Sequence, residues 1–129
     1  MTTTTFAVRR ATPSDKDKVI ALSRAVDEHD FIAEIYDFWM TADGPEGFYV
    51  AEQEGRIIGC YCLEFHGAGQ AYFYAMRIHP NAQGKGIGTR FCQLQVEQAR
   101  SAGAEDIYLL SVLDNQRAHR TVEKNGFVN

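Results

Sequence analysis

The stretch Gln83-Gly84-Lys85-Gly86-Ile87-Gly88-Thr89-Arg90 places three alternate glycines between a predicted strand and a predicted helix. Glycine lets the backbone approach a ligand closely, and the first turn of a helix presents N–H groups that have no partner within the helix. Such a turn can bind a phosphate or pyrophosphate, and Lys85 and Arg90 would add positive charge.

Two common phosphate-binding motifs do not fit this stretch. A Walker loop requires Ser or Thr after Gly-Lys, whereas Gly86 follows Lys85, and the first glycine of that motif would fall at His79. A dinucleotide-binding fingerprint would place its third glycine at Thr89, and it belongs to a βαβ unit near the start of a domain.

The template Gln/Arg-x-x-Gly-x-Gly/Ala fits in full, with Gln83, Gly86 and Gly88 at the specified positions. It follows Ile78-His79-Pro80, an apolar strand end and a proline. The flanking segments alternate between the hydrophobic period of a strand and that of a helix. Strands are expected at 6–10, 48–52, 56–65, 70–78, 107–113 and 126–128, and helices at 12–26, 31–39, 86–102 and 115–124.

Local signals fix several of these boundaries. Thr12-Pro13-Ser14-Asp15 provides a cap, a proline at the first helical position and an acid three residues after the cap. The pair Glu54-Gly55 predicts a tight hairpin turn. Strict alternation along 70–78 places Tyr72, Tyr74 and Met76 on one face, with Phe73, Ala75 and Arg77 on the other.

Composition predicts one soluble domain over residues 1–129. Of the 129 residues, 45% are hydrophobic and 23% are charged, which is enough apolar material for a core and excludes a disordered chain. No apolar run reaches the roughly 18 residues that a membrane span needs, so we expect no membrane association and a cytoplasmic protein. The net charge of −4 argues against nucleic acid as a partner.

The three cysteines are expected to be small buried hydrophobes. Cys60 and Cys62 fall on one face of a predicted strand, and Cys92 falls in a predicted helix. An odd count argues against a disulfide framework, and three thiols without a fourth ligand make a poor zinc site. We therefore expect no metal.

The glycine motif resembles the acetyl-coenzyme A site of the GNAT superfamily of N-acetyltransferases. A second signature of that family matches at Asn115-Gln116-Arg117-Ala118 and Glu123-Lys124-Asn125-Gly126-Phe127. The resemblance implies an α+β fold, with a mixed, mostly antiparallel central sheet and helices on both faces. It also implies acetyl-CoA as the co-substrate, and an acetyltransferase that acts by direct attack in a ternary complex.

By the same resemblance, backbone N–H groups from Gln83 to Thr89 hold the pyrophosphate. The pantetheine arm pairs with the backbone of Met76 to Ile78, where the fourth and fifth strands splay apart, and a backbone N–H near Ile78 polarises the thioester carbonyl. Asn115 and Arg117 lie where the family places the cofactor. For Arg117 the alternative is a solvated basic face.

The resemblance leaves the proton-transfer groups open. Many relatives use a Glu on the fourth strand as the base, but 70–78 holds no carboxylate and Tyr72 takes the aligned position. Glu64 and His66 on the preceding strand are the nearest substitutes, or else solvated edge residues. The usual Tyr that protonates the leaving thiolate is replaced by Val122, and Tyr108 and Ser111 are possible stand-ins.

We expect the acceptor to be a primary amine of a small molecule or amino acid. The early helices carry acids for a cation and aromatics for stacking, in the segments 27–31 and 36–39. A helical stripe of Ile32, Ile35, Phe38 and Trp39 is more commonly core than pocket. The N-terminal half also weakly resembles the histidine N-acetyltransferase-like branch. The alternatives are a protein N-terminal or lysine acetyltransferase, and a non-catalytic acyl-CoA-binding module.

One strand of the family pattern is absent from the sequence. Relatives usually carry a further strand after Gly-Phe, whereas this chain stops at Asn129. An unpaired sheet edge is normally covered in proteins. We therefore expect either a sequence that ends early or a homodimer that completes the C-terminal edge of the sheet.

Overall fold

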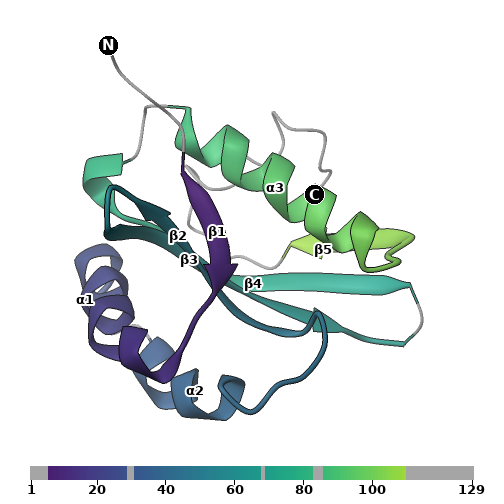
Figure 1. Ribbon diagram of the computed structural model, residues 1–129, viewed down its shortest axis with the longest axis horizontal. Helices are drawn as coiled ribbons and strands as arrows, with labels where there is room; N and C mark the ends of the chain where they lie inside the picture. Colours follow the sequence, from purple (N-terminus) through teal and green to yellow (C-terminus); the bar gives the residue numbers. More distant parts are fainter. Residues whose placement is uncertain (1–5, 29–30, 68, 83–85, 110–129) are drawn as a thin grey trace.

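The computed structural model describes residues 6–28, 31–67, 69–82 and 86–109. Over these residues the elements follow the predicted order (Figure 1). They are β1 (Ala7–Arg10), the 3-10 turn η1 (Pro13–Asp15), α1 (Lys16–Val26), α2 (Ile32–Trp39), β2 (Gly47–Gln53), β3 (Arg56–Phe65), β4 (Gln70–Ile78), the 3-10 turn η2 (Pro80–Ala82), α3 (Ile87–Ser101) and β5 (Asp106–Leu109).

The described strands form one mixed sheet in the order β1-β2-β3-β4-β5. Neighbours from β1 to β4 pair antiparallel, and β5 pairs parallel with β4. The hairpin between β2 and β3 turns at Glu54 and Gly55, whose φ angles are 52° and 78°. Two positive φ angles are what a tight two-residue hairpin turn requires, so the predicted turn is confirmed.

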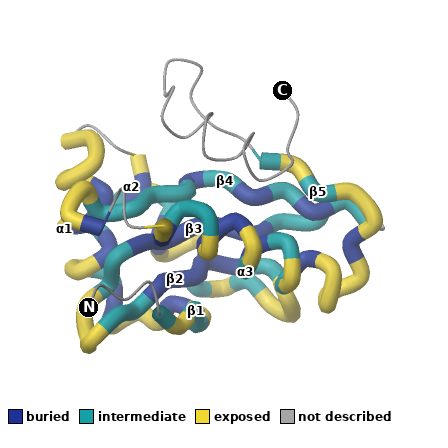
Figure 2. Tube along the Cα trace, turned by 90° about the horizontal axis from the view of Figure 1, so that it is seen from above, coloured by how far each residue is buried: buried dark blue, intermediate teal, exposed yellow. Residues whose placement is uncertain are grey.

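Helices cover both faces of the sheet, as predicted. In Figure 1, α1 and α2 lie on one side and α3 lies on the other. The core therefore has two parts, one on each face of the sheet. Figure 2 shows buried residues along the central strands, which separate the two parts. The α1/α2-face cluster includes Val19, Leu22, Ile32, Tyr36, Trp39, Phe48, Val50, Cys60, Cys62 and Ala75. The α3-face cluster includes Tyr49, Ala51, Tyr61, Leu63, Ala71, Phe73, Phe91 and Ala99.

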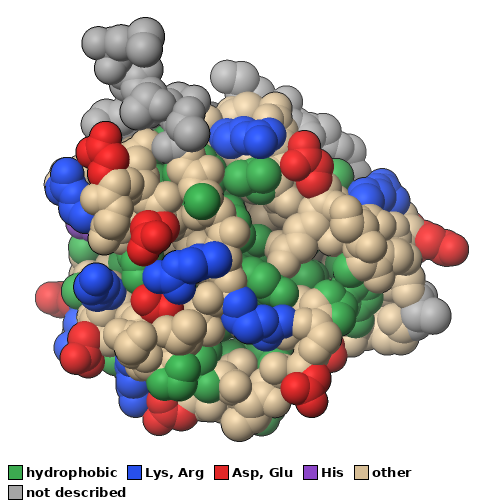
Figure 3. Space-filling model, viewed as in Figure 1, with side chains coloured by type: hydrophobic (Ala, Val, Ile, Leu, Met, Phe, Trp, Pro, Cys, Tyr) green, Lys and Arg blue, Asp and Glu red, His purple; other side chains and the backbone are tan. Residues whose placement is uncertain are grey.

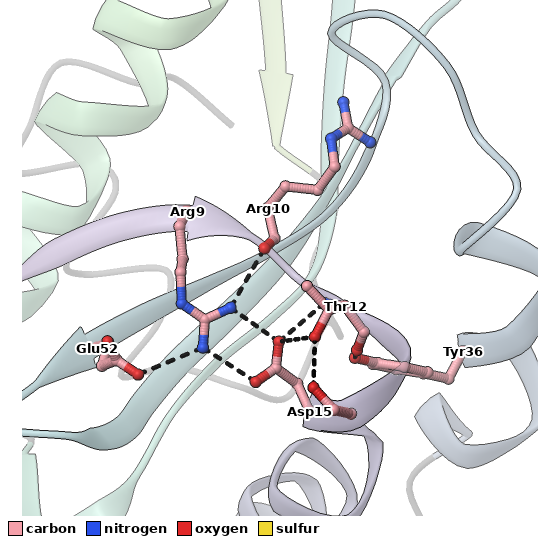
Figure 4. A network of polar contacts seen from close by, with 7 residues as sticks. Arg9, Arg10, Thr12, Asp15, Tyr36 and Glu52 are labelled. Carbon is pink, nitrogen blue, oxygen red and sulfur yellow. Dashed lines mark hydrogen bonds and ion pairs between the residues drawn. The ribbon is translucent and has the colours of Figure 1, made fainter.

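A polar network fixes the start of α1 against the sheet (Figure 4). Arg9 on β1 donates to both carboxylate oxygens of Asp15, at 2.8 and 2.9 Å, and to Glu52 on β2 at 3.3 Å. The Thr12 N–H donates to Asp15 Oδ2 at 2.8 Å, which is one half of the predicted capping arrangement. The Tyr36 hydroxyl of α2 donates to the Thr12 carbonyl at 2.6 Å. One buried carboxylate thus joins the sheet to the first helix.

The predicted alternation along β4 fails at Ala75. This residue has a φ of 56°, and the β3–β4 register shifts between Cys60 and Cys62. A bulge adds one residue to a strand, so the side chains beyond it change faces. Tyr74 and Ala75 pack in the α1/α2-face cluster, whereas Met76 packs on the opposite face with Phe73. The prediction that Met76 shares a face with Tyr72 and Tyr74 was wrong.

All three cysteines are free and buried, as predicted. Cys60 and Cys62 lie together in the α1/α2-face cluster. Burial raises the pKa of the Cys62 thiol well above its usual range and the pKa of Cys92 to about 11. Both thiols therefore stay protonated near neutral pH and are poor nucleophiles.

Several predictions fall outside the described residues. They are the part of the fifth strand beyond Leu109, the short helix at 115–124 and the sixth strand at 126–128, with the homodimer expected from it. Among the helices that the structure describes, none has the length and apolar character needed to cross a membrane.

Candidate active site

The first part of the candidate site is the N-terminus of α3, which follows β4 through η2. Gly86 is the N-cap residue and has a left-handed φ of 76°. The helix ladder begins with the Arg90 N–H, which donates to the Gly86 carbonyl at 3.2 Å. The N–H groups of Ile87, Gly88 and Thr89 precede this bond and so have no partner within the helix.

This helix end fits a pyrophosphate. Its first turn holds no acidic residue that would repel an anion. Ile87 is 1% exposed and anchors the turn in the protein interior. Unpaired N–H groups and the positive end of the helix dipole both favour a bound anion. Gln83, Gly84 and Lys85, which were predicted to share this role, lie outside the described residues.

The second part is the end of β4 beyond the bulge. Met76 and Ile78 are half-buried on the α3 face of the sheet, and Ile78 lies opposite Gly59 in the ladder with β3. The ladder between β4 and β5 joins Gln70–Phe73 with 106–109, so within the described residues it stops before Met76. The cofactor contacts predicted for Met76 and Ile78 therefore stay predictions. Both residues lie on the end of β4 that continues through η2 toward α3.

The third part lies on the α1/α2 face of the sheet, where the structure brings the two predicted base candidates together. Glu64 Oε1 contacts Nε2 of His66. Glu64 Oε2 accepts a hydrogen bond of 2.9 Å from the Tyr74 hydroxyl. The His66 ring lies over Tyr72, with 4.2 Å between centroids. We call these four residues the Glu64 cluster.

Tyr74 is the member of this cluster that the sequence reasoning missed. Glu64 and Tyr72 are register partners across β3 and β4, and Tyr74 follows two residues later on the same face. That spacing was the available signal, because i and i+2 on neighbouring strands lie within reach of long side chains. Burial and the hydrogen bond to Glu64 raise the pKa of Tyr74 above its usual range, so the hydroxyl stays a neutral donor.

Aromatic rings extend the Glu64 cluster in two directions. Tyr72 stacks on Tyr108 of β5, with centroids 4.7 Å apart and an interplanar angle of 14°. Trp39 of α2 meets Tyr74 edge to face at 5.7 Å. Tyr108 is 41% exposed, whereas Trp39 is buried. The cluster thus rests on packed rings and opens to solvent near His66, whose side chain is 50% exposed.

The aromatic residues predicted to line an acceptor site divide into two groups. Tyr36 is fully buried and bonds to Thr12, so it is a core residue. Phe38 is 70% exposed and Phe31 is 47% exposed, which corrects the expectation that Phe38 belongs to a core stripe. Arg77 of β4 lies over the Phe31 ring at 5.7 Å.

Charge is mixed around these elements. Figure 3 shows basic and acidic side chains interspersed on the face seen in Figure 1. Over the described residues there is no group of three or more His, Cys, Asp or Glu that could hold a metal ion. Asn115, Arg117, Val122 and Ser111 lie outside those residues, and their predicted roles are not tested.

Residues 14–127 match the Acetyltransferase (GNAT) family, so the chain belongs to that family. The mycothiol acetyltransferase of Streptomyces avermitilis is 31% identical over 84 residues, which are 64% of this chain and 27% of that protein. The chain spans less than a third of the length of the curated relatives it matches.

Two solved structures illustrate the shared fold. A transcriptional regulator from Bacillus halodurans is 21% identical, with a TM-score of 0.80 over 96% of this chain and 93% of that one. The PaiA N-acetyltransferase from Thermoplasma acidophilum, solved with coenzyme A, is 18% identical, with a TM-score of 0.79 over 96% of this chain and 90% of that one. At these identities the likeness concerns the fold alone.

Proposed function

We propose that this protein transfers the acetyl group of acetyl-CoA to a primary amine of a small molecule. The observation that carries the proposal is the left-handed Gly86 cap of α3, the next α-helix along the chain after the strand that bears Tyr72 and Tyr74. The helix end proposed for the cofactor thus follows β4, and the Glu64 cluster joins β4 to the end of the neighbouring β3.

Acetyl-CoA, when bound, would supply an activated thioester. The N–H groups of Ile87, Gly88 and Thr89 would hold its pyrophosphate, with Gln83, Gly84 and Lys85 expected to extend that cradle. The backbone of Met76 to Ile78 would pair with the pantetheine arm, and the oxyanion contact is assigned to the Ile78 N–H. These residues bind and orient, so their side chains contribute more to affinity than to chemistry.

The amine must be neutral before it can attack. The Glu64 cluster supplies a carboxylate and an imidazole at a solvent-exposed edge, and either could take the ammonium proton. The nitrogen lone pair then forms the new C–N bond as the C–S bond breaks, and the attacking nitrogen loses its second proton, which passes to the departing thiolate. A thiol has a pKa near 8.5, so it leaves tolerably without a strong acid.

Two observations favour a small-molecule acceptor. Mycothiol acetyltransferases are the curated relatives reported above, and their name specifies a small molecule. Phe31 and Phe38 also leave large apolar surfaces exposed beside α2. Protein N-termini and lysines are the second acceptor class, and the test below includes them.

The experiment is a screen of free coenzyme A release from acetyl-CoA in the presence of amines. The panel holds amino acids, polyamines, aminosugars and N-terminal peptides. We expect turnover with at least one small amine and a slower background with peptides. Tight acetyl-CoA binding without turnover by any amine would instead favour a non-catalytic acyl-CoA-binding module.

A further inference from the structure

We propose that Nδ1 of His66 accepts the proton of the acceptor ammonium, and that Tyr74 is a positioning residue that acts through Glu64. The proposal deepens the proposed function and rests on it. It assigns different roles to residues that the sequence offered only as alternatives.

The two imidazole nitrogens of His66 have different surroundings. Nε2 of His66 faces Glu64 Oε1, so in the neutral ring this contact is satisfied when Nε2 carries the hydrogen. The lone pair is then on Nδ1. Within the described ranges, no hydrogen bond to Nδ1 of His66 is present, and the side chain is half exposed. Nδ1 is therefore the nitrogen that an incoming ammonium can reach.

Both carboxylate oxygens of Glu64 are engaged. Oε1 faces His66 and Oε2 accepts from Tyr74, and the side chain is 32% exposed. A carboxylate held in this way orients the ring and stabilises the imidazolium that forms, which is the arrangement of base and orienting acid in hydrolase triads. Glu64 is thus the orienting group and His66 the base.

Tyr74 joins the Glu64 cluster to the core. Its ring packs against Trp39 and its hydroxyl fixes Glu64 Oε2. Tyr72 supports the imidazole from β4 by ring contact. Other titratable or charged groups also lie on this face of the sheet. Tyr108 stacks on Tyr72, and the Glu46 carboxylate accepts a hydrogen bond of 2.9 Å from the Phe65 N–H. The buried thiols of Cys60 and Cys62 lie along β3, and Arg77 lies farther along β4.

The proton transfer balances without a further reactant. The N–H bond of the ammonium breaks and an Nδ1–H bond forms, which leaves imidazolium beside the Glu64 carboxylate. The freed lone pair is the one that attacks the acetyl carbon. The proton leaves His66 through its exposed edge to water, and this restores the neutral ring.

The first test is the tautomer of His66, read by long-range ¹H–¹⁵N correlation NMR on the full-length protein. We expect the neutral ring to carry its hydrogen on Nε2 in the wild type. A neutral ring with its hydrogen on Nδ1 would overturn the assignment. This readout needs no acceptor and no cofactor.

The second test compares Tyr74→Phe with Tyr49→Phe, using the best amine of the release screen. Tyr49→Phe also removes a hydroxyl hydrogen bond that is partly buried, to the Pro45 carbonyl at 2.7 Å, but Tyr49 lies on the α3 face. Tyr74→Phe should lower kcat about tenfold with KM unchanged, because a lost hydrogen bond of roughly 1.4 kcal/mol is tenfold in rate. It should also move the acidic limb of the pH profile of kcat/KM to higher pH. Without the hydrogen bond from Tyr74, the negative charge of Glu64 would hold the proton on His66 more tightly.

Tyr49→Phe should leave that limb in place. If the acidic limb of the kcat/KM profile does not move in Tyr74→Phe, the positioning role of Tyr74 is contradicted. If Tyr74→Phe does not fold, as judged by circular dichroism, Glu64→Gln replaces it and should move the limb to lower pH.

The third test is His66→Ala, which should lower kcat by about 100-fold and leave acetyl-CoA affinity unchanged. Unchanged kcat would overturn the base assignment while leaving the proposed function intact. Absence of turnover in the wild type with every amine would defeat the proposed function itself.

Discussion

Tyr74 and Glu64 lie on neighbouring antiparallel strands, and the Tyr74 hydroxyl donates a 2.9 Å hydrogen bond to Oε2 of Glu64. The same tyrosine packs edge to face on the buried Trp39. A carboxylate near the protein surface is thereby held by a residue that belongs to the core. The position of the Glu64 carboxylate therefore depends on how α2 packs against the sheet.

The left-handed cap of α3 gives the first prediction. Gly86→Glu should weaken acetyl-CoA binding by more than 100-fold, because both bulk and negative charge would occupy the anion site. Isothermal titration calorimetry measures the affinity. Gly55→Glu is the matched control, since Gly55 has a φ of 78° against 76° for Gly86, and a Cβ there meets nothing within 4 Å. Equal loss in both variants would point to backbone strain rather than to a lost site.

The buried carboxylate at the start of α1 gives the second prediction. The hydrogen bonds from Arg9, opposed by burial, hold the pKa of Asp15 well below its usual range. A depressed folded-state pKa contributes stability above the unfolded value, about 3.9, and loses it as the pH falls toward the folded value. Asp15→Asn should therefore lower the free energy of unfolding by about 2 kcal/mol at pH 7.

Urea denaturation at a series of pH values checks this expectation. The difference between wild type and Asp15→Asn should shrink progressively below about pH 4. Asp17→Asn removes the same charge from an exposed position in the first turn of α1 and should change stability little. A difference for Asp15→Asn that does not vary with pH would contradict the ionic explanation.

A pair of glutamines on α3 gives the third prediction. Gln95 is fully buried, and neither polar atom of its side chain has a hydrogen-bond partner in the described part of the chain. Gln98 accepts a hydrogen bond from the Tyr61 hydroxyl. An unsatisfied buried amide costs about 1–3 kcal/mol, so Gln95→Leu should raise the free energy of unfolding by about 1 kcal/mol.

Gln98→Leu is the matched comparison on the same helix. It leaves the Tyr61 hydroxyl without a partner and should lower the free energy of unfolding by about 1–2 kcal/mol. Thermal denaturation of both variants measures whether each substitution raises or lowers stability. A loss of stability in Gln95→Leu would mean that its amide is satisfied after all.

Sequence alone predicted the order of the described elements, because hydrophobic period, turn glycines and a capping motif act locally. Thr12-Pro13-Ser14-Asp15 is a local signal that favours a helix start, and Glu54-Gly55 suits a hairpin turn because glycine readily adopts a positive φ. These signals need no knowledge of the tertiary fold. The bounds of β4 were therefore predicted to the residue.

The bulge at Ala75 and the composition of the Glu64 cluster were harder to predict. The residue type at position 75 does not predict a positive φ, because alanine rarely adopts one. One extra residue in β4 then moved Met76 to the other face. Likewise, Glu64 and His66 were proposed as alternatives, and only the pairing of β3 with β4 places Tyr74 beside them. Non-local pairing decides such contacts.

The proposed function requires that this chain move the acetyl group of acetyl-CoA to a small amine. The most direct measurement follows the label from [¹³C-acetyl]-CoA by mass spectrometry, with the best acceptor of the release screen and with wild type, His66→Ala and Gly86→Glu. We expect label in the amine with the wild type and at least a 100-fold lower rate with each variant. Label recovered only as free acetate, with none in any amine, would contradict the account.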